Sequence, residues 1–167
     1  MFNLRDGPAN IWVISDTHLR SGQILPDAFT RRAGREDIII HLGDFVSPEI
    51  IKQLKTIARL EAISGNCDPP SIRKSFPFER IIEISGVKIA LSHGWGGQTE
   101  TVQRVKRDFE GKVDVALFGH THSPYHAKSD GTVFFNPGSL SQSRRGPDSF
   151  GLLHLDSEGI WGEVIEL

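Results

Sequence analysis

Five short apolar segments in this chain each end close to a side chain that can bind a metal ion. The segments lie at residues 11–14, 38–40, 62–63, 89–91 and 115–118. The side chains that follow them are Asp16 and His18, Asp44, Asn66, His93, and His120 and His122. Short apolar runs are typical of buried strands, and open α/β sheets bind ligands just beyond the carboxyl ends of their strands. We therefore expect these seven nitrogen and oxygen donors to meet at one edge of the protein.

Helical segments are predicted between the strands, so that neighbouring strands run parallel and crossover helices join them. The clearest helix follows Ser47, a suitable N-cap, and begins with Pro48, a residue favoured in the first turn. Its apolar stripe consists of Ile50, Ile51, Leu54, Ile57 and Ala58. A second helix is expected from about Thr99, and a shorter one over residues 27–33.

Antiparallel hairpins are predicted in the rest of the chain, because glycine-containing turn sequences separate short strand-like segments. The turns are Ser85-Gly86, Asp130-Gly131 and Ser157-Glu158-Gly159. The first two are flanked by strands at 80–84 and 87–92 and at 124–128 and 132–135. Parallel strands joined by helices, together with several hairpins, predict an α/β protein, α+β in some schemes, in which two mixed sheets pack between helices.

Length, charge and cysteine content restrict the class of protein. The 167 residues suffice to bury a large core as one domain over residues 1–167 without disulfides or a structural metal. The net charge of −2 argues against specific nucleic-acid binding. Cys67 is the only cysteine, no secretion signal is recognisable, and no apolar run approaches the length of a membrane span. We therefore expect a soluble cytoplasmic protein that does not bind membranes.

The donor types and their spacing favour a site for borderline divalent metals. Asp16 and His18, like His120 and His122, are two residues apart, which places paired side chains on one side of an extended chain. Imidazole and carboxylate suit manganese, zinc, iron, cobalt and nickel, whereas calcium prefers more oxygen donors. Each pair alone is also typical of an ordinary strand end, so the prediction depends on the order of all five segments.

The complete set of motifs resembles the calcineurin-like metallophosphoesterase family. The motifs are Asp16-x-His18, Gly43-Asp44, Gly65-Asn66-Cys67-Asp68, Ser92-His93-Gly94 and Gly119-His120-Thr121-His122. Within that family the chain is similar to the small bacterial and archaeal phosphodiesterases that are related to the retromer subunit Vps29, and the resemblance extends from Ile11 to Ser139. It implies a four-layer α-β-β-α sandwich and a metal-dependent phosphoesterase, most simply a phosphodiesterase that acts on a small phosphate ester.

The resemblance also implies a centre of two divalent metals, of which manganese is favoured, and hydrolysis by in-line attack of a hydroxide that bridges them. The first metal would be held by Asp16, His18 and His122, and the second by Asn66, His93 and His120. Asp44 would bridge the two metals. Asp44 and Asn66 would be catalytic, and Asn66 and His93 would also contact the substrate.

One position departs from the common family pattern. Many relatives carry a histidine after the asparagine, where it protonates the leaving oxygen, but this chain has Cys67. A thiol is the poorer proton donor, which predicts a preference for esters with acidic leaving groups. Cys67 is equally interpretable as a packed small apolar residue. Trp95, which follows His93, is a candidate wall for binding the base or aryl group of a substrate.

Several other polar residues have both a functional and a structural interpretation. His41 either orients a ligand or is an ordinary core histidine, and Asp68 either pairs with a ligand histidine or stabilises a turn. Arg144 and Arg145 either bind a second phosphate or are merely solvated. We assign structural roles to His126, to His154 and to the loop Asn136-Pro137-Gly138-Ser139.

Two other functions compete with a phosphoesterase. Vps29 keeps this architecture as a structural subunit, so a protein-interaction scaffold is the main alternative. Vps29 has replaced some ligands, whereas all seven positions here carry coordinating side chains, which favours an enzyme. A nuclease is disfavoured because the chain has no basic surface or added domain. The native metal, the substrate and the oligomeric state, including a homo-oligomer, are left open by the sequence.

Overall fold

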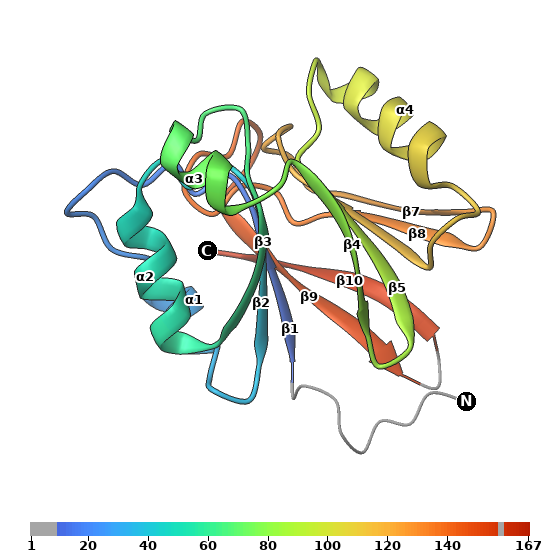
Figure 1. Cartoon of the computed structure of the whole chain (residues 1–167). Helices are drawn as coiled ribbons and strands as arrows, with labels where there is room; N and C mark the ends of the chain where they lie inside the picture. The colour runs from blue at the N-terminus through green and yellow to red at the C-terminus, as the bar shows by residue number, and fades with distance from the viewer. Residues whose placement is uncertain (1–9, 157–158) are drawn as a thin grey trace.

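The first β-sheet carries three of the predicted ligand-bearing strands. In this computed structural model, which describes residues 10–156 and 159–167, its strand order is β10-β9-β1-β2-β3 (Figure 1). The strands are β1 (Ile11–Ile14), β2 (Ile38–Leu42), β3 (Arg59–Ile63), β9 (Ser149–Asp156) and β10 (Gly159–Glu166). Strands β1, β2 and β3 are parallel, whereas β9 pairs antiparallel with β1 and with β10. The first three strands therefore end at the same edge.

The second β-sheet carries the other two ligand-bearing strands, and its order is β4-β5-β6-β8-β7. The strands are β4 (Glu79–Ile84), β5 (Val87–Ser92), β6 (Val115–Phe118), β7 (Tyr125–Ser129) and β8 (Thr132–Asn136). Strands β5, β6 and β8 are parallel, and the β4/β5 and β7/β8 pairs are antiparallel hairpins. Both sheets are thus mixed, as predicted.

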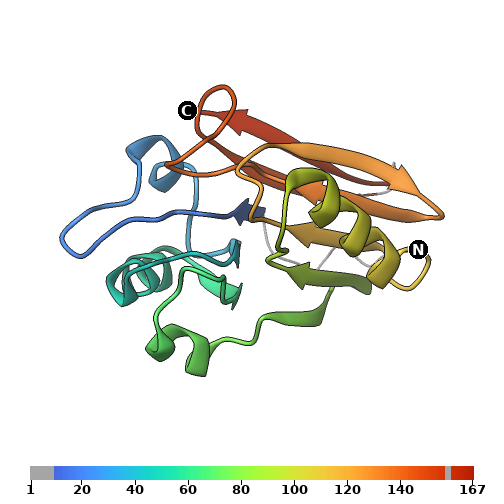
Figure 2. The ribbon, with the colours of Figure 1, turned by 90° about the horizontal axis from the view of Figure 1, so that it is seen from above.

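The alternation of side chains along each strand builds three apolar layers. Val13 and Ile40 of the first sheet pack against Ile89 and Leu117 of the second, in the core between the sheets. The outer face of the first sheet is covered by α1 (Asp27–Thr30), α2 (Pro48–Ile57) and α3 (Pro70–Ser75), and that of the second by α4 (Gln98–Phe109). Figure 2 shows α4 on the opposite side from the other three helices. The four-layer sandwich is therefore confirmed.

The helices follow the predicted pattern with three differences. The Ser47 hydroxyl accepts a hydrogen bond from the Glu49 N–H, and Ile50 and Leu54 of α2 are buried. Ala58 lies beyond the end of α2 in extended backbone, and α1 ends at Thr30, so both helices are shorter than expected. Helix α3 was not predicted, because six residues are too few to establish an apolar periodicity.

The hairpins have the backbone that their turn residues favour. Both central residues of the Ser85-Gly86 turn have positive φ, 53° and 79°, and those of the Asp130-Gly131 turn have 45° and 78°. Two consecutive left-handed residues give the type I′ turn that matches the twist of paired strands. The predicted turn between the last two strands lies largely outside the described residues, because these omit 157 and 158.

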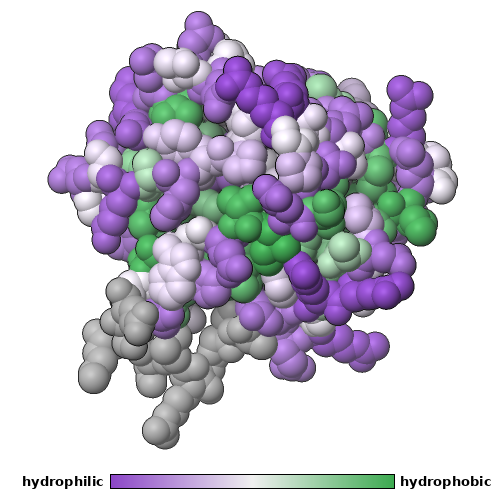
Figure 3. All heavy atoms as spheres, turned by 180° about the vertical axis from the view of Figure 1, so that it is seen from behind, coloured by the Kyte–Doolittle hydropathy of each residue, from purple (hydrophilic) through white to green (hydrophobic). Residues whose placement is uncertain are grey.

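Exposed large apolar side chains are few on the described surface. They are Ile24, Phe78, Ile81, Trp95 and Leu167. The face seen in Figure 3 is mostly polar, with a smaller apolar area near its centre. Within the described part of the chain, no helix is both long and apolar enough to cross a membrane.

Candidate metal centre

All seven predicted donors lie together at the strand ends. His122 Nε2 is 3.2 Å from Asp16 Oδ1 and 3.2 Å from His18 Nε2. Asp44 Oδ2 is 3.4 Å from the Nε2 atoms of both His18 and His93. These contacts join residues from both sheets, so the sandwich itself assembles the cluster.

The first group of donors surrounds an oxygen that has no hydrogen bond. One ligand atom from each of Asp16, His18, Asp44 and His122 lies within 4.8 Å of the others. Asp16 Oδ1 belongs to this group, is buried, and accepts no hydrogen bond within the described structure. A buried carboxylate oxygen without a partner is energetically costly unless a cation binds it. The group is therefore suited to a metal ion.

Hydrogen bonds to main-chain carbonyls fix the orientation of two of the imidazoles. His122 Nδ1 is 2.6 Å from Gln142 O, and His93 Nδ1 is 2.6 Å from Leu42 O. A carbonyl oxygen can only accept a hydrogen bond, so each Nδ1 carries the proton. In the neutral rings Nε2 therefore directs a lone pair toward the carboxylates, as a metal ligand does.

The second group of donors converges on Asn66. Its Oδ1 is 3.0 Å from His93 Nε2 and 3.0 Å from His120 Nδ1. His120 Nε2 is 3.0 Å from Gly96 O and is the protonated nitrogen, so in this ring, unlike His93 and His122, Nδ1 is the acceptor. The Asn66 amide nitrogen donates to Cys67 Sγ at 3.3 Å, which turns Oδ1 inward. When His93 is deprotonated, as a metal ligand must be, three acceptors face one another around a second position suited to a cation.

Asp44 belongs to both groups. Oδ2 contacts the imidazoles, while Oδ1 accepts a 2.7 Å hydrogen bond from the Cys67 N–H. Burial alone would raise the pKa of Asp44, but its hydrogen bond with His93 and the charges of nearby histidines hold the pKa well below its usual range. The carboxylate is therefore ionised at neutral pH and available to two cations.

Most of the ligand residues adopt a left-handed backbone. Positive φ angles occur at Asp16 (51°), His18 (45°), Asp44 (61°), His120 (68°) and His122 (54°). This conformation costs an L-residue about 1 kcal/mol or more, and such strain gathers at functional sites. Turns with positive φ, and not the extended backbone expected from the spacing of two, thus carry the pairs Asp16/His18 and His120/His122.

Glycines next to the ligands allow the turns to approach one another closely. A Cβ on Gly65 would overlap the backbone nitrogen and carboxylate of Asp44, and one on Gly119 would overlap the Ser15 hydroxyl. Alanine at either position would thus displace a ligand turn.

Asp68 stabilises the turns and contacts no ligand histidine. Its buried carboxylate accepts hydrogen bonds from the backbone N–H groups of Asp44 at 3.0 Å, Val46 at 2.8 Å and Gly65 at 2.7 Å. The turn after β2 is thereby tied to the turn after β3. The structural interpretation of Asp68 is confirmed.

His41 combines its two predicted roles. Its Nδ1 accepts from the Gly43 N–H at 3.1 Å, and Nε2 lies 3.2 Å from Thr17 Oγ1, which donates to Asp44 O at 3.3 Å. Burial lowers the pKa of His41 to about 3, so the ring is neutral. His41 is a satisfied core histidine that supports the Asp44 backbone through Thr17.

The loop after β8 braces the ligand turns. Asn136 donates to Gly119 O at 3.0 Å, and the Ser139 hydroxyl donates to Asp16 O at 2.8 Å. Further along, the Arg144 N–H donates to His122 O at 3.3 Å, and the Arg144 and Arg145 side chains are exposed. His126 and His154 lie on β7 and β9, where His126 packs against Phe135 and His154 against Trp161. None of these residues is a donor of the two groups.

Cys67 is not the packed apolar residue that one interpretation predicted. It is exposed, because the turn that carries it faces solvent between two strand ends. Trp95 is 55 % exposed, and the Arg104 guanidinium carbon lies 3.0 Å from its ring centroid. The sequence did not identify Phe78, whose ring centroid is 6.4 Å from that of His93 at 88°. Phe78 precedes Glu79, which pairs with Ser92, so only strand pairing places it beside His93.

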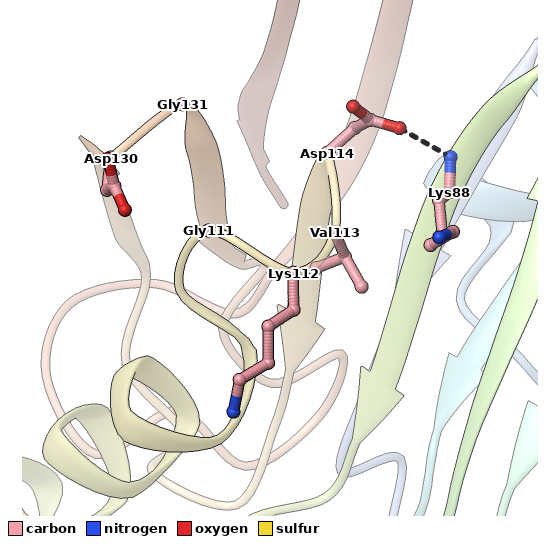
Figure 4. Close-up of a pocket in the computed structure, with 7 residues that line it drawn as sticks. All are labelled: Lys88, Gly111, Lys112, Val113, Asp114, Asp130 and Gly131. Carbon is pink, nitrogen blue, oxygen red and sulfur yellow. Dashed lines mark hydrogen bonds between the residues drawn. The ribbon is translucent and has the colours of Figure 1, made fainter.

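A separate cavity of about 250 Å³ lies near the beginning of β5 and β6 and is not part of this centre (Figure 4). Two of its charged side chains already have partners. Asp114 accepts from the Lys88 N–H at 2.8 Å, and Lys112 Nζ donates to the carbonyl of Asp108 in α4 at 2.9 Å. The ligand cluster is at the opposite ends of these strands.

The metal-free protein is expected to lose stability as the pH rises from about 6.5 to about 9. Burial alone would lower the pKa of His93, but the hydrogen bond with Asp44 and the charges of Asp16 and Asp44 raise it from 6.5 to about 9. Folding therefore favours protonated His93. The contribution of this proton to the free energy of unfolding is complete below pH 6.5 and is lost as the pH rises through 9. Added metal should stabilise the protein most at the upper end of this pH range, because the metal competes with the proton on His93.

Thermal unfolding across this pH range, with chelator and with added manganese, checks the expectation. His93→Gln should flatten the pH dependence of the chelated protein and reduce the stabilisation by manganese. A chelated wild-type protein whose melting temperature does not fall between pH 6.5 and 9 would contradict it.

Comparison with known proteins adds an independent observation. Residues 10–158 match the model of the calcineurin-like phosphoesterase superfamily domain. The chain is 34 % identical to a probable metallophosphoesterase of Methanothermobacter thermautotrophicus, with 93 % of this chain and 91 % of the relative covered. It is 28 % identical to a phosphodiesterase of Methanocaldococcus jannaschii, with 93 % and 99 % covered. Its fold resembles that of Vps29 from Entamoeba histolytica in complex with Zn²⁺, with a TM-score of 0.70, 26 % identity, and 94 % and 98 % covered.

Proposed function

Because the chain belongs to the calcineurin-like phosphoesterase superfamily, we propose that it is a metal-dependent phosphodiesterase with a binuclear centre. The observation that carries this proposal is the arrangement of acceptors in two groups that share Asp44. The relative described as a phosphodiesterase and the Zn²⁺ complex of Vps29 support it. Since the family match spans residues 10–158, we treat the chain as one domain of this kind.

The donor sets fit two divalent cations. Asp16, His18 and His122 would hold one cation, Asn66, His93 and His120 the other, and Asp44 both. Two carboxylates, one amide and four imidazoles suit manganese, zinc, iron, cobalt or nickel, and we favour manganese. When bound, such ions supply an activated water nucleophile and positive charge that stabilises the transferring phosphoryl group. Asp44, which is buried and ionised, would contact both cations and so link the two donor groups.

The substrate would approach from the side of the second donor group. In the turn that carries Asn66, both Asn66 and Cys67 are exposed, whereas Asp16 and His122 of the first group are buried. The Asn66 amide and the His93 ring lie where they can orient a phosphate oxygen, and Trp95 follows in the next turn. A phosphate ester bound there would contact solvent on one side and fixed donors on the other, as a preorganised site requires.

A substrate panel on protein reloaded with single metals tests the proposal. The metal-free protein is incubated with manganese, zinc, iron, cobalt or nickel and offered an aryl diester, an aryl monoester and a cyclic nucleotide. We expect turnover of the diester, greatest with manganese, and none with chelator. Since Vps29 is a structural neighbour, folded protein that binds metal but hydrolyses no ester would instead favour a protein-interaction scaffold.

Esters with acidic leaving groups are expected to react faster than alkyl esters. Although Cys67 is exposed, partial desolvation of its thiol and the charge of Asp44 raise its pKa to about 11, so Cys67 keeps its proton and donates it poorly to a leaving oxygen. Cys67→His should accelerate alkyl esters by about tenfold to a hundredfold and aryl esters much less. The measurement is kcat/KM for leaving groups of graded pKa, with Cys67→Ser as the matched control. Equal rates for aryl and alkyl diesters in the wild type would refute this assignment.

A further inference from the structure

Phe78 is an exposed aromatic residue held against the centre. It is 42 % exposed, yet its ring lies edge to face with the fully buried ring of His93. His93 in turn contacts Asn66, whose side chain is exposed. Phe78 and Asn66 therefore flank the same histidine on the solvent side of the second donor group.

The segment that carries Phe78 is fixed to the first sheet. Ser64, the residue after β3, donates from its N–H to Pro77 O at 2.9 Å and from its hydroxyl to Phe76 O at 3.0 Å. Phe76 stacks on Phe45 with ring centroids 5.8 Å apart. These contacts hold the backbone before Phe78, and the pairing of Glu79 with Ser92 holds the backbone after it, so an exposed ring is carried on a fixed segment. A rigid, exposed aromatic ring loses little entropy when a ligand packs against it.

None of the polar contacts of the centre requires an aromatic side chain at position 78. Phe78 is not one of the seven donors of the centre. The nearby β4 side chains already have partners, since Glu79 accepts a hydrogen bond from the Ser92 hydroxyl and Arg80 forms an ion pair with Glu61. An apolar ring beside a polar centre suits a ligand that has an anionic group next to a planar apolar one. Trp95, in the turn after His93, is a second exposed aromatic residue at the same strand end.

We propose that Phe78 binds a planar aromatic group of the substrate, so that the preferred esters are phosphodiesters with an aryl or nucleobase substituent. This inference rests on the proposed function. Ring packing of this kind contributes a factor of about 3 to 10 in affinity. The effect of Phe78 is on affinity and depends on whether the organic group of the ester is planar. The effect of Cys67 is on rate and depends on the acidity of the leaving group.

Two inhibitors of equal charge and similar size separate planarity from bulk, namely phenylphosphonate and cyclohexylphosphonate. Their Ki against an aryl diester and their Kd by calorimetry are measured with manganese-loaded protein. We expect phenylphosphonate to bind the wild type about fivefold more tightly. Phe78→Leu, which keeps an apolar side chain against His93, should bind both equally. Phe78→Ala should give the same loss of preference.

Ile81→Ala is the matched control, because Ile81 is an exposed apolar residue (54 %) on β4, the strand that Phe78 precedes. It should retain the preference, and unfolding temperatures identify variants that are misfolded. Equal affinities in the wild type, or a preference that survives in Phe78→Leu, would overturn the role of Phe78 while esters are still hydrolysed. If neither phosphonate binds and no ester is hydrolysed, the proposed function itself fails.

Discussion

Asp44→Asn is expected to lower kcat/KM for an aryl diester by about 1000-fold or more, equivalent to about 4 kcal/mol of transition-state stabilisation. The change removes the negative charge that both donor groups share. The fold should persist, because an asparagine oxygen can still accept the hydrogen bond from the Cys67 N–H. The measurement is steady-state hydrolysis with manganese, together with the number of metal ions bound per chain.

Asp37→Asn is the matched control for this result. Asp37 is also a buried carboxylate beside β2, but at the opposite end of the strand, where it accepts from Trp12 Nε1 at 2.9 Å. The Asp37→Asn protein should be less stable than the wild type, but its activity per folded molecule should stay near the wild-type value. An Asp44→Asn protein that keeps wild-type turnover would show that the binuclear mechanism is wrong.

Asp68→Ala is expected to destabilise the fold by about 3 kcal/mol and to lower the melting temperature by about 10 °C. Three backbone N–H groups, two of them in buried hydrogen bonds, lose their acceptor. Activity should also fall, because two of these groups belong to Asp44 and to Gly65, which precedes the ligand Asn66. Chemical denaturation and hydrolysis rates measure the two effects separately.

Asp68→Asn separates the lost hydrogen bonds from the lost charge. Oδ2 accepts from Asp44 and Gly65, whereas Oδ1 accepts only from Val46. An asparagine oxygen at the Oδ2 position keeps two of the three bonds, so this variant should lose less stability than the alanine variant. Equal unfolding free energies for Asp68→Ala and the wild type would contradict the role given to Asp68.

The donor set was predictable because each ligand lies within a few residues of a strand that the apolar pattern marks. Asp16 and His93 are examples, since an apolar run of a strand ends two residues before each of them. The two-sheet sandwich followed from the same pattern together with the hairpin turns. Local sequence carries this information because strand ends, turns and apolar alternation are all short-range properties.

Contacts between distant segments were not predictable. The carbonyls of Leu42, Gly96 and Gln142 decide which nitrogen of each histidine faces the centre, yet any residue type supplies a carbonyl. Phe78 reaches His93 only through the pairing of β4 with β5. Such contacts depend on strand register and loop geometry, which a single sequence encodes only through the complete fold.

The left-handed backbone at most of the proposed ligand positions restricts which residue types can stand there, and therefore which metals the site would suit. Among non-glycine residues, asparagine, aspartate and histidine adopt positive φ most readily, and they are also oxygen and imidazole ligands. Cysteine, the usual ligand of soft metals, is not among the residue types that favour this backbone. The only cysteine of the chain is Cys67, which is not among the residues with positive φ. The turn conformation thus disfavours thiolate ligands at five of the seven positions before any question of metal affinity arises.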